Sequence, residues 1–260
     1  MCSRCTFLAG VGAFAAAPAL ASARTGDPAY LEIAFSGMRR VANTVWLGQL
    51  TPNVWVFTTT EILDGDTGYY PANGAIVVDG SEALIIDPGW RPEHATILLD
   101  AWRQLKLAPI TQGLVTHFHR DRIGGLPVLR SRGVPAYGNP LTIGLAMDSG
   151  FVAPSPLHEV QKHPARLGGV EVFYPGPGHT LDNVVAWVPS DGVLFGGCLV
   201  KSTTAAGLGN VADADIPVWP TAMRTLAARY PYVKRVIPGH GTVSGDSLAH
   251  TLVLAIAGKA

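Results

Sequence analysis

The chain has 260 residues, with 19 Lys and Arg against 19 Asp and Glu, so its formal net charge is zero. A chain of this length accommodates one large domain, and a neutral chain carries no field that attracts nucleic acid, which excludes a polyanion partner. Charged residues make up 15% of the chain, against roughly 25% in an ordinary soluble domain, and part of this deficit lies at the N-terminus.

Residues 1–23 have the pattern of a secretory signal peptide. Arg4 supplies the basic start, residues 7–20 are apolar and small, and residues 21–23 read A-S-A, which fits a cleavage site. The apolar run is shorter than the roughly 18 to 20 residues that a membrane span needs, and no later segment is long and apolar enough to span. We therefore expect an exported, periplasmic protein with one domain over 24–260 and no membrane partner.

The next part of the chain is rich in β-branched and aromatic residues and predicts paired strands. Residues 45–50 and 54–61 are separated by the turn signal T-P-N and are expected to form a hairpin. A glycine-rich loop at 63–73 precedes a second strand pair within 74–87, which turns at D-G. Loops of that length are usually functional or mobile.

After Asp87 the pattern alternates between helix and strand. Apolar residues at helical spacing predict a helix over 93–105, followed by a buried strand at 110–115 and a helix that begins near Gly124. The second half repeats the theme, with strands expected at 170–174, 184–188, 193–195 and 233–237 and helices at 220–230 and from about 246. This order indicates an α/β domain of two stacked sheets with helices outside.

The segment T-H-F-H-R-D-R at 116–122 carries two histidines and an aspartate at alternate positions. Residues two apart share a face on an extended segment but not on a helix, so His117, His119 and Asp121 converge only in strand or loop geometry. The motif follows a predicted strand and precedes two glycines, which permit a tight turn. In α/β sheets, sites form at this carboxyl end of the strands.

Three further potential metal ligands follow small residues in matching contexts. His179 lies in P-G-P-G-H-T, Cys198 in L-F-G-G-C, and His240 in I-P-G-H-G. Imidazole, thiolate and carboxylate together are a ligand set suited to zinc. Six ligands exceed one tetrahedral ion, so we expect two Zn²⁺ ions with an open position between them. The remaining histidines are expected to be surface or capping residues: His94, His158, His163 and His250.

At these motifs the chain resembles the metallo-β-lactamases of subclass B1, and the segments Y-P-A-N-G and G-N-V-A-D-A-D-I-P-V-W-P are similar to the VIM-type branch. The resemblance runs from about Trp55 to Gly241. It implies the αββα sandwich of that family, two stacked mixed sheets with helices on the outer faces. It also implies zinc-dependent hydrolysis of the amide bond of penicillins, cephalosporins and carbapenems by a metal-bound hydroxide, which gives antibiotic resistance.

The resemblance further implies roles for individual residues. One zinc would be held by His117, His119 and His179, and the other by Asp121, Cys198 and His240. Asp121 and Asn210 would act in catalysis, with Asn210 near the lactam carbonyl. Lys201 would bind the carboxylate of the substrate, and residues 62–70 match the flap that covers it. Arg122 and Asp87 would support the metal loop from behind.

Two other functions remain open at this stage. The first is hydrolysis of a different cyclic or activated acyl bond, such as a lactone or a thioester, in the same fold. Relatives of that kind generally have a histidine and a bridging aspartate where this chain has Arg122 and Cys198. The second is zinc binding without catalysis, for which a closed coordination sphere would be the better design. The neutral charge and the single domain predict a monomer.

Overall fold

The first sheet is formed by the N-terminal half of the chain. The computed structural model describes residues 33–63 and 68–258, so the predicted signal peptide lies outside the described residues. Eight strands follow one another in chain order across the sheet, antiparallel up to β5 and parallel from β5 to β8. They are β1 (Arg39–Ala42), β2 (Val45–Gln49), β3 (Val54–Ile62), β4 (Tyr69–Asp79), β5 (Glu82–Ile86), β6 (Ile110–Leu114), β7 (Ala136–Gly138) and β8 (Ser155–Pro156).

The second sheet has five strands, of which only the pair β12 and β13 is parallel. Its strands are β9 (Ala165–Leu167), β10 (Val170–Phe173), β11 (Val185–Val188), β12 (Val193–Gly197) and β13 (Arg235–Pro238). The helices are α1 (Pro92–Gln104), α2 (Arg120–Ile123), α3 (Leu126–Ser131), α4 (Pro140–Asp148), the short 3₁₀ helix η1 (His158–Gln161), α5 (Trp219–Arg229) and α6 (Ser247–Ala257). Both sheets are therefore mixed, as predicted.

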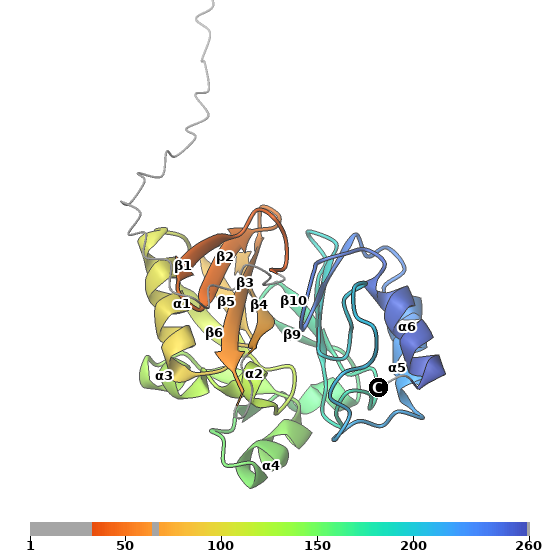
Figure 1. Cartoon of the computed structure of the whole chain (residues 1–260). Helices are drawn as coiled ribbons and strands as arrows, with labels where there is room; N and C mark the ends of the chain where they lie inside the picture. The colour runs from red at the N-terminus through yellow and green to blue at the C-terminus, as the bar shows by residue number, and fades with distance from the viewer. Residues whose placement is uncertain (1–32, 64–67, 259–260) are drawn as a thin grey trace, which may run out of the picture. The chain divides into compact units, whose positions relative to one another are not determined.

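Period-two alternation explains why the sheets are covered on both faces. In β5, Leu84 and Ile86 pack into the core between the two sheets, whereas Ile85 packs under the helices α1 to α3. A separate core lies between the second sheet and the helices α5 and α6, with Trp219 fully buried in it. Figure 1 shows the resulting order of layers, with helices outside two facing sheets. This confirms the αββα sandwich.

Two predicted boundaries are wrong. The loop expected over 63–73 is shorter, because β4 already begins at Tyr69 and pairs Tyr70 with Glu61 and Tyr69 with Ile62. Tyrosine favours a paired, half-buried strand, and this pairing outweighs the turn signals of Gly68 and Pro71. The helix expected near Gly124 is α3, which begins slightly later, at Leu126 with Gly125 as its N-cap, and the separate single turn α2 before it was not predicted.

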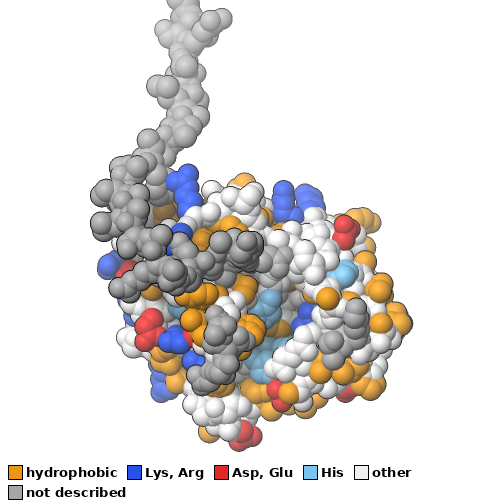
Figure 2. Space-filling model, viewed as in Figure 1, with side chains coloured by type: hydrophobic (Ala, Val, Ile, Leu, Met, Phe, Trp, Pro, Cys, Tyr) orange, Lys and Arg blue, Asp and Glu red, His pale blue; other side chains and the backbone are white. Residues whose placement is uncertain are grey.

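Within the described part of the chain, no helix combines the length and the apolar character required to cross a bilayer. Figure 2 shows histidine side chains gathered on the face that is also seen in Figure 1. In the chain, His117 and His119 follow β6, His179 follows β10 and His240 follows β13, which are the places where the sequence motifs predicted a site.

Candidate metal centre

The metal motif lies directly after β6, at the carboxyl end of the parallel part of the first sheet. His117 and His119 are in the connecting loop, and His119 is the N-cap of α2 with extended backbone. Asp121 is in the first turn of α2, so the backbone of the motif changes from extended to helical between its second and third potential ligands, His119 and Asp121. The expectation of strand or loop geometry therefore holds for the histidines but not for the aspartate.

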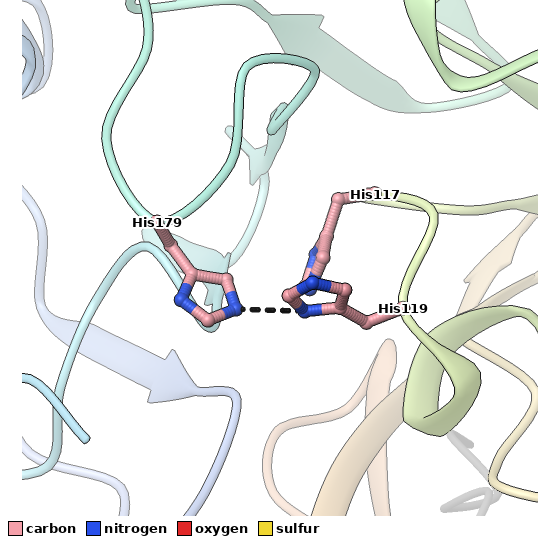
Figure 3. A group of neighbouring side chains, drawn as sticks. All are labelled: His117, His119 and His179. Carbon is pink, nitrogen blue, oxygen red and sulfur yellow. Dashed lines mark hydrogen bonds between the residues drawn. The ribbon is translucent and has the colours of Figure 1, made fainter. Parts of the chain in front are cut away.

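His117, His119 and His179 form one cluster. One ring nitrogen from each histidine lies within 4.8 Å of one from each of the other two, and His119 Nδ1 is 3.1 Å from His179 Nε2. The rings meet edge to face, with centroids 4.8 to 4.9 Å apart. Figure 3 shows His179 reaching across from one loop to the two histidines of the metal motif. Three imidazoles that converge in this way are a common set of zinc ligands.

The electrostatics of this cluster favour neutral imidazoles. Burial lowers the pKa of His117 and of His179 well below the usual range, and neighbouring cations lower it further. The Nε2 atom of His117 and the Nδ1 atom of His179 are buried, and no described residue forms a hydrogen bond with either. A buried nitrogen without a partner costs free energy, whereas a neutral imidazole nitrogen is a good metal ligand. The cluster therefore fits a metal ion.

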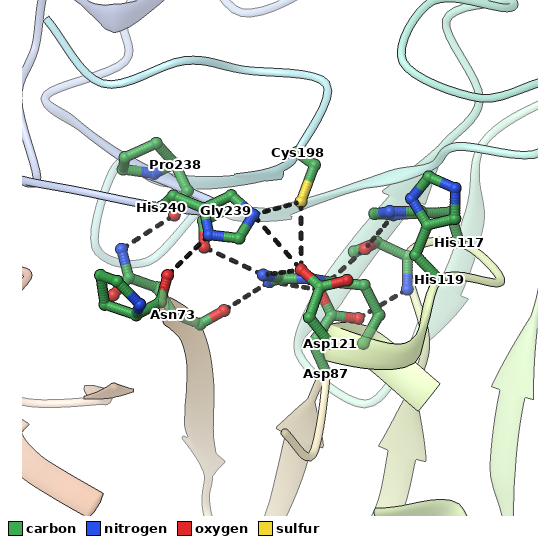
Figure 4. A network of polar contacts seen from close by, with 12 residues as sticks. Asn73, Asp87, His117, His119, Asp121, Cys198, Pro238, Gly239 and His240 are labelled. Atoms are coloured by element: carbon green, nitrogen blue, oxygen red, sulfur yellow. Dashed lines mark hydrogen bonds and ion pairs between the residues drawn. The ribbon is translucent and has the colours of Figure 1, made fainter. Parts of the chain in front are cut away.

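Asp121, Cys198 and His240 form a second cluster beside the first. Cys198 Sγ lies 3.2 Å from His240 Nε2 and 3.5 Å from Asp121 Oδ2, and His240 Nε2 lies 3.3 Å from Asp121 Oδ2. His117 connects the clusters, since its ligand nitrogen is also within 4.8 Å of the ligand atoms of Asp121 and Cys198. Figure 4 shows these side chains pointing toward one another. All six predicted ligands are thus brought together.

Two glycines allow Cys198 and His240 to approach. Gly197 has a φ of 55°, a conformation that favours glycine, and it ends β12 directly before the cysteine. A Cβ atom on Gly239 would lie 2.6 Å from Cys198 Sγ. Any side chain at Gly239 would therefore displace the sulfur atom, which explains why small residues precede each of these ligands.

The second cluster has the charge pattern of a cation site. Burial opposes ionisation of Asp121, but Arg122 and His240 outweigh it and hold the pKa of Asp121 well below its usual range. Burial also opposes the charged form of His240, yet Cys198 and Asp121 outweigh it and raise its pKa to about 9. These side chains therefore stabilise positive charge between them. Carboxylate, thiolate and imidazole groups around a place that favours a cation are a donor set that suits zinc.

Arg122 is fully buried behind the two clusters. Its guanidinium donates to Asp121 Oδ2 from Nε at 2.7 Å, to the carbonyl of Asn73 at 2.6 Å and to the carbonyl of Gly239 at 3.0 Å. Asp87 Oδ2 lies 3.4 Å from Nη1 of the same guanidinium. This one side chain therefore joins the metal motif to β4, through Asn73, and to the loop after β13, through Gly239.

Asp87 is hydrogen-bonded to the residue that precedes His117. Its carboxylate accepts hydrogen bonds from the backbone N–H and the hydroxyl of Thr116, each at 2.7 Å. Burial raises the pKa of Asp87 to about 6, against the opposing effects of Arg122 and Thr116. Asp87 has a φ of 54°, which is uncommon for a residue other than glycine and is most tolerable for Asp and Asn. The site thus retains some backbone strain where it holds the metal loop.

Two contacts were not predicted from the sequence. His119 Nε2 lies 2.9 Å from Asp213 Oδ2, and His240 Nδ1 lies 2.6 Å from the carbonyl oxygen of Pro71. Each contact occupies the ring nitrogen that faces away from the cluster and so sets the tautomer that presents the other nitrogen inward. The only available signals were the aspartates of the segment after Asn210 and the Y-P-A-N-G motif, and neither signal specifies a histidine partner.

The two residues expected to contact substrate are arranged differently. Lys201 is half-buried, and its Nζ lies 5.2 Å from the centre of the Trp219 ring. The Trp219 ring in turn lies beside His179, with ring centroids 5.9 Å apart, and the charge of Lys201 is one of the influences that lower the pKa of His179. Asn210 is exposed, and its Oδ1 accepts from the Ala212 N–H at 3.2 Å. The described contacts do not join Asn210 to the six clustered side chains.

Comparison with known proteins identifies the family. Residues 67–240 match the family model described as the metallo-beta-lactamase superfamily. The chain is 38% identical over 220 residues to a metallo-beta-lactamase type 2 of Bacillus sp. (strain 170), covering 84% of each chain, and 37% identical over 222 residues to one of Bacillus cereus, covering 84% of this chain and 85% of that one. A solved metallo-beta-lactamase from Pontibacter korlensis superposes with a TM-score of 0.75 at 37% identity, covering 82% of this chain and 99% of that one. The chain belongs to the metallo-beta-lactamase superfamily.

Proposed function

We propose that the protein hydrolyses the amide bond of β-lactam rings and does so with two zinc ions. The observation that carries the proposal is the meeting of six donor side chains in two adjoining clusters, behind which a buried arginine balances the anionic ligands. Relatives named metallo-beta-lactamase type 2 over most of their length support the substrate class. The expected substrates are penicillins, cephalosporins and carbapenems.

We assign one zinc to His117, His119 and His179, and the other to Asp121, Cys198 and His240. His117 is near both clusters, but the second cluster already has three donors without it. Zinc at such a site supplies Lewis acidity and makes water nucleophilic near neutral pH. A serine nucleophile is then not required.

The chain itself supplies binding and orientation. Arg122 keeps Asp121 ionised, so its carboxylate accepts a hydrogen bond from attacking water and orients it. Lys201 attracts the carboxylate beside the lactam nitrogen as a point charge. Asn210 lies on an exposed loop and is proposed to donate to the lactam carbonyl once substrate is bound.

Subclass B1 is the part of the family that we propose for this chain. The grounds are His117 and Cys198, because the sequence resemblance attributes asparagine at the first position to one other subclass and lack of the cysteine to another. Similarity to the VIM-type branch rests on the segments 70–74 and 209–220 alone.

The proposed function predicts a metal-dependent activity. Purified protein with added Zn²⁺ should hydrolyse nitrocefin and a carbapenem, and a chelator should lower both rates by at least about tenfold because the nucleophile depends on the metal. Adding back Zn²⁺ should restore them. A lactone assayed in parallel should not be turned over at a comparable rate. Lactone turnover without β-lactam turnover would favour the alternative hydrolase, and zinc binding without any turnover would leave a zinc-binding protein.

Cys198→Ser should weaken the second zinc site, because a hydroxyl is a poorer zinc ligand than a thiolate. We expect the zinc content to fall from two toward one per chain and kcat to fall by at least about 100-fold. Elemental analysis after dialysis and nitrocefin kinetics measure the two effects. His163→Gln, at an exposed histidine paired with Glu159, is the control and should change neither. Two tightly bound zinc ions in the serine variant would refute the assignment.

Lys201→Glu should raise KM for penicillins more than it changes kcat, because it reverses a charge contact with the bound substrate. A loss of about 10- to 100-fold in kcat/KM corresponds to an ionic contact of about 1.5–3 kcal/mol. Lys234→Glu makes the same charge change at an exposed position and should leave KM unaltered. An unchanged KM in the Lys201 variant would remove this residue from substrate binding.

We also propose that the protein is exported to the periplasm as a monomer, with residues 1–23 removed and the mature domain over 24–260. The signal pattern at the N-terminus supports this proposal. N-terminal sequencing of the protein recovered from the periplasm of an expressing bacterium should place the new terminus near Arg24. Recovery of the intact N-terminus from the cytoplasm would contradict it.

A further inference from the structure

An ion pair between a buried carboxylate and a half-exposed arginine lies at the outer end of the β3–β4 hairpin and is not part of the metal centre. Glu61, the second-last residue of β3, is only 4% exposed. Arg91 donates to both of its carboxylate oxygens, from Nε to Oε2 and from Nη2 to Oε1. Glu61 Oε1 also accepts from the backbone N–H of Ile62 at 2.9 Å. This bidentate geometry fixes both distance and orientation.

Arg91 belongs to the same short segment that supports the metal loop. It is the N-cap of α1 and follows Asp87, whose carboxylate holds Thr116, by four residues. The segment between them is packed tightly, because a Cβ atom on Gly124 would lie 2.0 Å from the carbonyl oxygen of Trp90. One end of residues 87–91 is therefore bound to the metal loop, and the other end is bound to the hairpin through Glu61.

The carboxylate of Glu61 is stabilised in its ionised form. Burial raises the pKa of Glu61, but Arg91 and the N–H of Ile62 outweigh it, and the charge of Arg120 lowers the pKa further. Arg120 stands between the ligands His119 and Asp121. Arg91, which donates to both carboxylate oxygens, is thus the main group that stabilises the charge of Glu61.

The hairpin end that Glu61 holds presents apolar surface beside the site. Ile62, Tyr69 and Tyr70 are 43%, 37% and 39% exposed, and the next residue, Pro71, contacts the His240 ring. Exposed apolar side chains at this place are suited to the apolar substituents of a substrate. These side chains can contact a substrate bound at the metal centre only if their distance from the metal ligands is kept constant.

We propose that the Glu61–Arg91 pair is a positioning device for substrate binding, which holds the outer end of the β3–β4 hairpin at a set distance from the metal loop. The inference rests on the proposed β-lactam hydrolysis. Replacing Arg91 would deprive the buried carboxylate of Glu61 of its bidentate donor, whereas an ion pair with a half-exposed arginine adds little net stability. The main contribution of the pair is therefore to fix the position of the hairpin rather than to stabilise the fold. The pair belongs to the binding step and touches none of the reacting atoms.

A charge-exchange experiment tests this proposal in the zinc-loaded, full-length protein. Glu61→Gln and Arg91→Gln should each raise KM for nitrocefin by about five- to tenfold, a coupling of about 1 kcal/mol, with kcat within about twofold and zinc content unchanged. The double variant Glu61→Arg with Arg91→Glu should recover most of the lost affinity. Asp100→Asn is the matched control, because it breaks the pair with Arg132 at 2.7 Å on the surface of α1, and it should leave KM unaltered.

Amide hydrogen exchange gives a readout that does not depend on activity. The amides of Ile62, Tyr69 and Tyr70 should exchange faster in Glu61→Gln than in the parent, while those of β6 stay protected. Unchanged KM together with unchanged amide hydrogen exchange in both single variants would overturn the proposal. So would a rise in KM in the single variants that the double variant with reversed charges does not repair. If Glu61→Gln does not fold, Arg91→Gln, at a half-exposed side chain, gives the same comparison. Absence of β-lactam turnover in the parent would refute only the proposed function. The amide hydrogen exchange would still test whether the Glu61–Arg91 pair holds the end of the hairpin.

Discussion

The metal centre depends on one buried guanidinium. Taking an arginine out of water costs several kcal/mol unless its charge and its donors are satisfied, and Arg122 is satisfied only when three separate parts of the chain are in place. Asp121 supplies the nearest carboxylate, while β4 and the loop after β13 supply the carbonyls of Asn73 and Gly239. The arginine thus balances the anionic ligands and at the same time requires these segments to meet.

The elements with strong local signals were predictable from the sequence. The strands β3 to β5 are rich in β-branched residues and bounded by turn signals, and the helix α1 has apolar residues at helical spacing. All six clustered donors follow buried strands or glycine-rich turns that mark the carboxyl edge of a sheet. The short strands β7 to β9 and the helix α4 were not predicted. Their segments are only two to nine residues long, too short for periodicity to distinguish them from loops.

Contacts between segments far apart in the chain were out of reach for the same reason. Asp213 is 94 residues from His119, and Pro71 is 169 residues from His240. No local pattern encodes such pairs, since an exposed aspartate and a backbone carbonyl are found everywhere in a chain. The Glu61–Arg91 pair is a third example, because each residue by itself reads as an ordinary charged position near the end of an element. Such pairs can be identified only from the folded structure, in which the two groups lie within contact distance.

The six donors are divided evenly between the halves of the chain. His117, His119 and Asp121 come from the first half, and the other three come from loops of the second sheet. A cation bound by residues from both halves would link the two sheets. Because it would bind only the folded state, it would increase the free energy of unfolding of the protein. With zinc as the proposed cation, loss of the metal would lower the stability of the fold as well as the activity.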